Sequence, residues 1–260
     1  MVFCSTLNNK YFLGACVTLN SLARHNGTSV LYYIFCFENI SNEKKDILLK
    51  IYPNIAFKMI PSDEYCEYAL NEKFRAWSYN VFNRFEIFTL DVDKIIFLDF
   101  DIVVLGSIEG LINAECEFGA CIRDKDDMPD YLHKDNFEAG IMVIGNRYIN
   151  PDTKFKLLEI SKSYKWTSDE PVLNYFFNDN ITFLPKRYNV MTTEYADNMD
   201  DVAILHYVGF KKPWNKGSVL DRYDAYVSQK NTTESFLKLS SVYEKELILL
   251  NRILPASDLE

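Results

Sequence analysis

The stretch KIIFLDFD, residues 94–101, combines a continuous apolar run with two aspartates at its end. An apolar run of this length, without alternating polar residues, is typical of a strand that is buried on both faces of a parallel sheet. Ligands of such sheets bind beyond the carboxyl ends of the strands. Asp99 and Asp101 therefore mark a candidate ligand site at the end of a central strand.

Strand-like runs and helical patterns alternate on both sides of this stretch. The strand-like runs cover residues 2–6, 30–37, 55–60, 94–98, 118–122, 140–144, 181–184 and 202–205. The helical patterns cover residues 11–24, 43–51, 74–90, 148–163, 170–177 and 235–254. This alternation predicts an α/β fold, with a mostly parallel central sheet flanked by helices and a helical C-terminal tail.

The composition is that of an ordinary soluble globular protein. Of the 260 residues, 48% are hydrophobic and 25% are charged, which excludes disorder for most of the chain. The net charge of −9 repels phosphate backbones and disfavours a nucleic-acid partner. The six cysteines form no CxxC pair and are expected to be reduced core residues. Without a membrane-spanning run or a secretory signal pattern, the expected location is the cytoplasm.

The two aspartates after the central strand suit a divalent cation. Two buried carboxylates are costly unless a cation pairs with them, and carboxylate oxygens are the ligands that Mg²⁺ and Mn²⁺ prefer. Such an ion would in turn hold phosphates. A solvated turn between a strand and a loop is the alternative for a lone D-x-D motif.

A phosphohydrolase is a second interpretation of the same residues. Asp99, Asp101 and Val103 satisfy the D-x-D-x-[TV] pattern of enzymes that use an aspartate nucleophile. That motif normally stands on the first strand, whereas several strand and helix units precede it here. The acidic pair that such enzymes also need is hard to place, so this interpretation is the weaker one.

A second motif, HYVGFKKPW at residues 206–214, follows the strand-like run 202–205. A neutral His206 can complete a metal site that carboxylates begin. Gly209 allows the backbone to approach a diphosphate closely, and Lys212 offers a point charge to phosphate oxygens.

Together, D-x-D and the later H-x-x-G-x-x-K-P-W resemble the motifs of glycosyltransferase family 8, the family of the glycogenins and the bacterial lipopolysaccharide galactosyl- and glucosyltransferases. The resemblance extends from Phe3 to about Trp214. It implies a Rossmann-like GT-A fold, a UDP-hexose donor, Mn²⁺ or Mg²⁺ as the cofactor, and transfer with retention of anomeric configuration. It also implies a catalytic domain at residues 1–215 and a helical extension at 216–260, packed on that domain.

The resemblance assigns roles to individual residues. It implies that Asp99, Asp101 and His206 are the metal ligands. The residues implied to bind the donor are Thr6, Asn8, Tyr11, Arg84, Asp99, Phe100, Asp101, Asp124, Glu138, Ala139, Gly140, Gly209 and Lys212. Tyr11 would stack on uracil, Arg84 would face the diphosphate and the sugar, and Asp124 would contact the hexose. The alternatives are helix-start packing for Tyr11 and a surface ion pair for Arg84.

Two positions depart from the family motifs. The family's F-N-A-G is FEAG at residues 137–140, and its D-Q-x-x-L-N is DEPVLN at residues 169–174. Glu138 and Glu170 thus replace amides of the implied sugar pocket. We expect Asp169 and Glu170 to be catalytic, with Glu170 stabilising the oxocarbenium ion electrostatically or attacking it. The alternative for both is a role as acidic residues in the first turn of a helix.

The predicted activity is transfer of glucose or galactose from a UDP-sugar to a glycan, a lipid-linked sugar or a protein side chain. A catalytically silent sugar-nucleotide-binding protein is the alternative from another class. The tail 244–254 allows peripheral contact with a membrane, although its mixed charges favour packing on the domain. The sequence leaves the acceptor and the oligomeric state open.

Overall fold

The computed structural model describes residues 1–60, 65, 82–123, 136–163, 166, 168–192, 201–209, 212–215 and 233–254. The strands of this part are β1 (Val2–Leu7), β2 (Tyr32–Cys36), β3 (Ile55–Met59), β4 (Lys94–Leu98), β5 (Ile102–Val104), β6 (Phe118–Ile122), β7 (Phe137–Gly145), β8 (Thr182–Leu184), β9 (Val190–Met191) and β10 (Ile204–His206). The α-helices are α1 (Phe12–Asn26), α2 (Asn42–Ile51), α4 (Glu109–Ile112), α5 (Pro151–Ser163), α6 (Asp169–Phe177) and α9 (Thr233–Leu250). Short 3₁₀ helices are η1 (Asn9–Tyr11), η4 (Phe82–Thr89) and η6 (Lys186–Tyr188).

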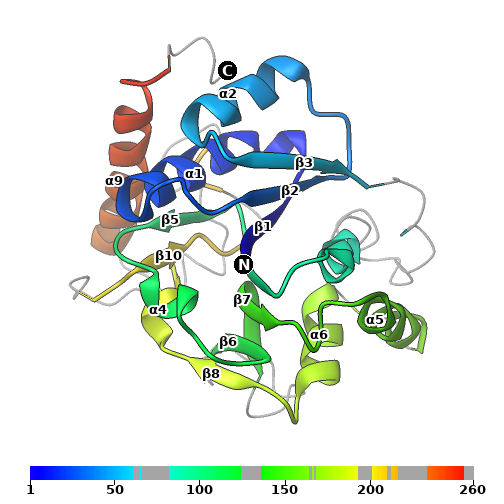
Figure 1. The fold of residues 1–260 in the computed structure, drawn as a ribbon. Helices are drawn as coiled ribbons and strands as arrows, with labels where there is room; N and C mark the ends of the chain where they lie inside the picture. The colour runs from blue at the N-terminus through cyan, green and yellow to red at the C-terminus, as the bar shows by residue number, and fades with distance from the viewer. Residues whose placement is uncertain are drawn as a thin grey trace.

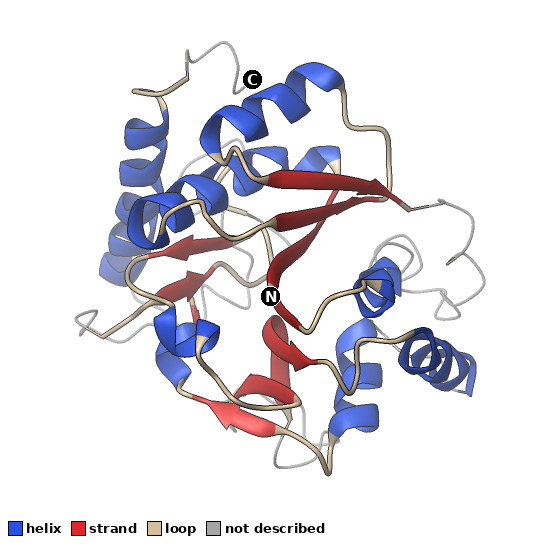
Figure 2. Ribbon diagram, viewed as in Figure 1, coloured by secondary structure: helices blue, strands red, loops and turns tan. Residues whose placement is uncertain are grey.

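The strands form a seven-stranded sheet and a three-stranded sheet (Figures 1 and 2). The larger sheet has the order β3-β2-β1-β4-β7-β6-β8, and the smaller has the order β5-β10-β9. Within the larger sheet only β7 runs antiparallel to its neighbours β4 and β6. The predicted α/β class with a mostly parallel, helix-flanked sheet is therefore confirmed.

Two apolar cores cover the two faces of the large sheet, because successive side chains of a strand point to opposite faces. In β4, Ile96 and Leu98 pack with α1, α2 and α9, whereas Ile95 and Phe97 pack with η4, α5 and α6. Strand β1 divides its side chains in the same way. Figure 1 shows the two groups of helices on opposite sides of the sheet.

The segment predicted as a helix at residues 74–90 differs from the expectation. Residues 74–81 lie outside the described residues, and Phe82–Thr89 form a 3₁₀ helix rather than an α-helix. Phe82, Phe85 and Phe88 recur every third residue and are fully buried. A period of three matches the three residues per turn of a 3₁₀ helix, so all three rings face one core.

Other predicted elements are confirmed with boundaries shifted by a few residues. Strands β5 and β9 were not predicted, because two or three residues are too few to show a period. The described cysteines are all unbridged, as expected, and Cys116 alone among them is only partly buried; Cys66 lies outside the described residues.

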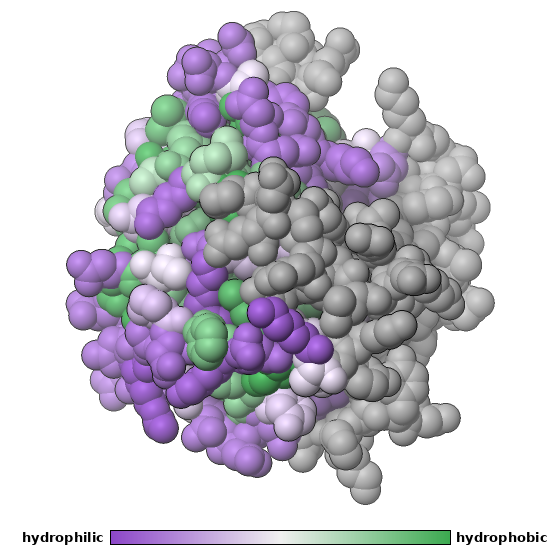
Figure 3. Space-filling view, turned by 90° about the vertical axis from the view of Figure 1, so that its right-hand side faces the viewer, coloured by the Kyte–Doolittle hydropathy of each residue, from purple (hydrophilic) through white to green (hydrophobic). Residues whose placement is uncertain are grey.

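The described surface is mixed in character. Figure 3 shows one face of the molecule, where hydrophilic residues surround smaller groups of apolar ones. Among the described helices, none combines the length and the hydropathy that crossing a bilayer requires.

Candidate active site

The arrangement of the two sheets brings polar residues from distant segments of the chain into one cleft. Asp99 to Asp101 connect β4 of the large sheet to β5 of the small one. Because β7 runs antiparallel to β4, its first residues lie beside the end of β4, and the Asp99 amide donates to the Gly140 carbonyl at 2.9 Å. Strand β10 pairs with β5 and places His206 opposite Ile102. The first turn of α6 adds Asp169 and Glu170 to the same cleft.

Asp99, Asp101 and His206 form a compact group. Each offers one ligand atom, and these atoms lie within 4.8 Å of one another. The His206 Nε2 atom is 3.2 Å from Oδ1 of Asp101. Gly140 leaves the room that the group needs, because a Cβ there would lie 2.3 Å from Cε1 of His206 and 3.2 Å from Oδ2 of Asp99.

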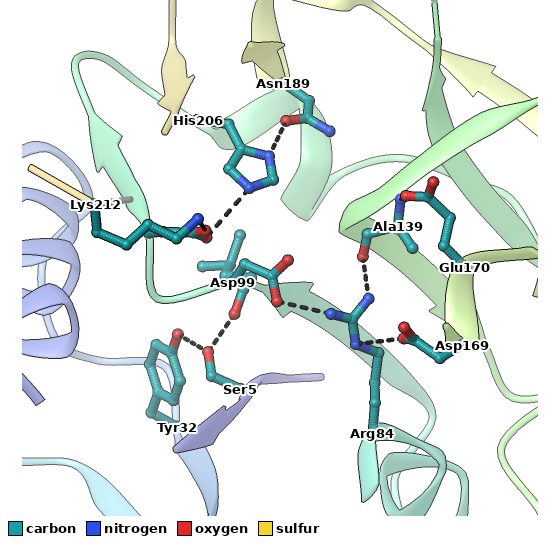
Figure 4. Close-up of polar contacts among 12 residues, drawn as sticks. Ser5, Tyr32, Arg84, Asp99, Ala139, Asp169, Glu170, Asn189, His206 and Lys212 are labelled. Atoms are coloured by element: carbon teal, nitrogen blue, oxygen red, sulfur yellow. Dashed lines mark hydrogen bonds and ion pairs between the residues drawn. The ribbon is translucent and has the colours of Figure 1, made fainter. Parts of the chain in front are cut away.

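Asn189 orients the histidine ring. Its Oδ1 atom lies 3.0 Å from Nδ1 of His206, and both side chains are buried (Figure 4). With Nδ1–H donating to this oxygen, the neutral ring presents its Nε2 lone pair to Asp101. Apart from the His206 ring, no hydrogen-bond donor among the described residues is aimed at the buried Oδ1 of Asp101. Two lone pairs facing each other across 3.2 Å fit a cation bound between them, so the residues present suit a divalent metal.

Lys212 supplies a buried positive charge beside the aspartates. Its Nζ atom donates to Oδ2 of Asp101 at 2.6 Å and to the Tyr207 carbonyl at 2.9 Å. Burial acts to raise the pKa of Asp101, but Lys212 and His206 outweigh burial and hold this pKa well below its usual range. Burial acts to lower the pKa of Lys212 and of His206, but Asp101 outweighs it and raises both.

Arg84 joins the metal-ligand group to the other end of the cleft. Its guanidinium contacts Asp99 at 3.0 Å, Asp169 at 3.1 Å and the Ala139 carbonyl at 2.9 Å (Figure 4). It also stacks over the Phe97 ring, 4.5 Å from the ring centroid. Burial raises the pKa of Asp99 to about 6, against the opposing charge of Arg84. Arg84 therefore makes buried ion pairs and not the surface pair considered as its alternative.

Glu138 and Glu170 meet at a shared arginine. Arg123 ion-pairs with Glu138 and, through Nη2, with Glu170 at 2.7 Å. The second Glu170 oxygen, Oε2, accepts the Ala139 amide at 3.0 Å. Burial and the nearby charge of Glu170 raise the pKa of Glu138 to about 7. Glu170 thus lies within the cleft and does not extend from the helix start into solvent.

The aromatic end of the cleft comes from the first loop and the second motif. Tyr11 packs edge-on against Trp214 at 5.6 Å between ring centroids, and Lys212 lies over its ring. The Asn8 side chain accepts the Tyr11 amide at 3.0 Å and so caps the 3₁₀ helix η1. Gly209 has φ 99°, a conformation that L side chains rarely adopt, which explains why glycine stands there.

These residues line one cleft of about 620 Å³. Of the residues singled out from the sequence, it is lined by Thr6, Asn8, Tyr11, Arg84, Asp99, Phe100, Asp101, Glu138, Gly140, Asp169, Glu170, His206, Gly209 and Lys212. Ala139 contributes its backbone through the bonds to Arg84 and Glu170. Asp124 lies outside the described residues. The lining residues that sequence reasoning missed are Lys10, Phe37, Arg123, Ser168 and Val208.

Gly140→Ala is expected to disturb the metal-ligand group. The added methyl must displace His206, so the free energy of unfolding should fall by about 1–3 kcal/mol, as for other overpacked sites. Gly106→Ala is the matched control, because its Cβ would meet the Ala203 Cα at an ordinary 3.9 Å. Urea unfolding of both variants measures the difference. Equal stability of the two would contradict the close approach of His206 to Gly140.

Comparison with known proteins decides the family. The model of the family described as glycosyl transferase family 8 matches residues 2–218, most of the chain. The chain belongs to glycosyltransferase family 8. The resemblance inferred from the two motifs is therefore confirmed.

Curated relatives of this family 8 chain include a lipopolysaccharide glucosyltransferase, a bacterial glycosyltransferase and a glycogenin. It is 26% identical over 245 residues to a lipopolysaccharide 1,2-glucosyltransferase of Escherichia coli, covering 80% of this chain and 71% of the relative. It is 28% identical over 157 residues to glycosyltransferase GlyF of Streptococcus pneumoniae, covering 54% and 39%. It is 27% identical over 221 residues to glycogenin of Neurospora crassa, covering 81% and 31%. The chain thus spans less than half the length of the last two.

Solved structures confirm the GT-A fold of this family 8 chain. An active-site mutant of LgtC, in which a glutamine is replaced by glutamate, superimposes with a TM-score of 0.68 at 21% identity, over 93% of this chain and 95% of LgtC. The galactosyltransferase LgtC in complex with donor and acceptor sugar analogs gives 0.66 at 21% identity, with the same coverage. GlyE of Streptococcus pneumoniae gives 0.63 at 19% identity, over 94% and 63%.

Proposed function

We propose that this family 8 glycosyltransferase moves glucose or galactose from a UDP-hexose to a carbohydrate-bearing acceptor, with retention of anomeric configuration and with Mn²⁺ as its cofactor. The observation that carries the proposal is the Asp99, Asp101 and His206 group, with a buried Asp101 oxygen facing the His206 ring, in the same cleft as Lys212 and Arg84. Mixed oxygen and imidazole ligands suit Mn²⁺ better than Ca²⁺ or Mg²⁺, although Mg²⁺ also fits the carboxylates.

The diphosphate end of the donor would lie at the metal-ligand group. A bound divalent cation supplies positive charge to the leaving UDP diphosphate. Lys212 adds a buried ammonium at the same place, and the positive φ of Gly209 leaves its backbone open to a phosphate. The uracil would stack on Tyr11 at the aromatic end of the cleft.

The sugar end of the donor would lie between Arg84, Asp169, Glu138 and Glu170. Arg84 holds Asp169 and Asp99 in fixed positions, so the carboxylates around the hexose are preorganised. Preorganised negative charge stabilises the positive charge that develops at the anomeric carbon as the bond to UDP breaks. The backbone of Ala139 and Gly140 would lie between the diphosphate end and the sugar end of the cleft.

Glu170→Gln is expected to lower kcat by at least about tenfold with little change in UDP affinity, because it removes a charge that acts in the transition state. The change restores the amide of the family motif at nearly constant shape. UDP release from the donor measures kcat, and calorimetry measures UDP binding. Wild-type kcat in this variant would reduce Glu170 to a structural residue of the helix start. A glycosyl adduct on Glu170, seen by mass spectrometry, would favour covalent catalysis instead.

The acceptor site is proposed only as a class. The relatives' names point to a lipopolysaccharide in one case and to glycogenin in another, so a glycan, a lipid-linked sugar and a protein side chain remain candidates.

We also propose residues 1–215 as the catalytic domain. The described part of the extension, α9, packs on α1 through the Arg24–Glu246 ion pair and accepts the Tyr207 hydroxyl at the Leu239 carbonyl, 2.7 Å away.

A silent sugar-nucleotide-binding protein is the second candidate. It predicts UDP-sugar binding without UDP release. The intact metal-ligand group and the buried Lys212 disfavour it, because a degenerate copy of such an enzyme would be expected to lose its metal ligands first.

A further inference from the structure

Arg123 lies at the sugar end of the cleft and contacts two acidic residues from different elements. It follows strand β6, and its amide donates to the Asn136 carbonyl at 2.9 Å, so the paired ends of β6 and β7 fix its backbone. Its side chain ion-pairs with Glu138 of β7 and with Glu170 of α6. The three side chains are 22%, 5% and 22% exposed, in the order Arg123, Glu138 and Glu170.

The pair of glutamates needs a cation. Two neighbouring carboxylates in a largely buried place repel each other, and an uncompensated buried charge is strongly destabilising. The family motifs that this sequence resembles have Asn and Gln at positions 138 and 170, and neutral amides need no such partner. Arg123 therefore accounts for both departures from the motifs at once, since its one charge faces both acids.

Arg123 also fixes the orientation of Glu170. One Glu170 oxygen accepts from Arg123 at 2.7 Å and the other accepts from the Ala139 amide at 3.0 Å, so both ends of the carboxylate are held. The carbonyl of the same Ala139 residue accepts a hydrogen bond from Arg84, which pairs with Asp99. A continuous set of polar contacts thus joins the sugar end of the cleft to the metal-ligand group (Figure 4).

We propose that Arg123 is a positioning residue for the transfer reaction: it compensates the charges of Glu138 and Glu170 and holds the Glu170 carboxylate in one orientation toward the donor sugar. This inference rests on the proposed function. It assigns Arg123 no contact with the substrate and makes its whole effect pass through the two glutamates.

The test compares Arg123→Gln in two backgrounds, the natural protein and the Glu138→Asn/Glu170→Gln double variant. The rate is UDP release from UDP-glucose and from UDP-galactose with Mn²⁺. In the natural background, Arg123→Gln should lower kcat at least about tenfold with little change in the donor KM. In the neutral background it should change kcat by less than about twofold, because the two acids that it serves are gone. Arg147→Gln, at an exposed arginine, is the matched control and should match the natural protein.

The pH dependence supplies a readout that a merely structural role would not move. Arg123 lowers the pKa of Glu138, so its loss raises this pKa further. Because the proposal requires Glu138 to be ionised, the acidic limb of the kcat profile shifts to higher pH in Arg123→Gln, and Arg123→Lys reverses most of this shift. Among the described residues, Arg84, Asp169 and His206 are further charged groups that act on the pair, and all three remain unchanged in these variants.

The outcomes separate this inference from the proposed function. No UDP release by the natural protein from any UDP-hexose would overturn both. Normal turnover by the natural protein, with the same loss for Arg123→Gln in both backgrounds, would overturn the inference alone and indicate direct contact with the substrate. Unchanged kcat in the natural background would also overturn it. If Arg123→Gln fails to fold, the same comparison of kcat in the two backgrounds is made with Arg123→Lys. Lysine keeps the charge but cannot contact both glutamates as the planar guanidinium does.

Discussion

Replacing Asp101 with asparagine is expected to abolish UDP release and to weaken Mn²⁺ binding by at least about a hundredfold. The carboxylate is buried, one oxygen pairs with Lys212 and the other faces only the His206 ring among the described residues. An amide keeps the shape, loses the charge and turns an NH₂ group or a neutral oxygen toward the imidazole. Loss of one ligand from a set of three removes much of the affinity for the cation.

Direct Mn²⁺ binding, followed by electron paramagnetic resonance, separates this effect from activity. Asp201→Asn is the control, because Asp201 is 83% exposed and pairs with Arg187 away from the cleft. Circular dichroism checks that Asp101→Asn folds, since breaking a buried ion pair costs about 3–5 kcal/mol. Natural Mn²⁺ affinity in a folded Asp101→Asn protein would remove Asp101 from the ligand set.

Lys212→Ala is expected to slow transfer by roughly 30- to 1000-fold, which corresponds to about 2–4 kcal/mol for a preorganised charge that stabilises a leaving group. The ammonium is buried, pairs with Asp101 at 2.6 Å and lies over the Tyr11 ring, so its charge is held beside the metal-ligand group. Lys212→Arg should restore only part of the rate, because a planar fork does not reproduce a point charge.

Single-turnover UDP release measures the Lys212 effect on the chemical step. Lys156→Ala removes an exposed lysine that pairs with Asp152 within α5, and it should leave the rate unchanged. A natural rate for Lys212→Ala would mean that the H-x-x-G-x-x-K-P-W motif serves the fold and not the diphosphate.

Much of the metal end of the cleft could be predicted from the sequence, because its residues lie in two short motifs. Asp99 and Asp101 follow an apolar run whose length marks a central strand, and His206 follows another. Sequence reasoning could join the two motifs in one metal site, but it did not predict that they follow strands of different sheets, β4 in the seven-stranded sheet and β10 in the three-stranded one. It could not place Asn189 behind His206, because that contact depends on the pairing of the two-residue strand β9 with β10.

The sugar end of the cleft was only partly predictable, because its residues lie far apart in the chain and meet only in the folded protein. Arg123, Glu138 and Glu170 come from three elements, and a lone arginine after a strand carries no local signal. One signal was present: two glutamates replace two amides, and the added negative charge calls for a nearby cation. The 3₁₀ helix η4 differs from the prediction for another reason, because phenylalanines spaced by three residues also fit a longer α-helical pattern.

UDP release from a panel of UDP-sugars, measured with Mn²⁺, with EDTA and after Mn²⁺ is restored, tests the central claim most directly. We expect release from UDP-glucose or UDP-galactose with Mn²⁺, loss of release in EDTA and recovery when Mn²⁺ is added back. Binding of UDP-sugars without release from any of them would indicate a silent binding protein, and phosphate release from small phosphoesters with indifference to UDP would indicate a phosphohydrolase. Full UDP release in EDTA would contradict the role of Asp99, Asp101 and His206 as metal ligands.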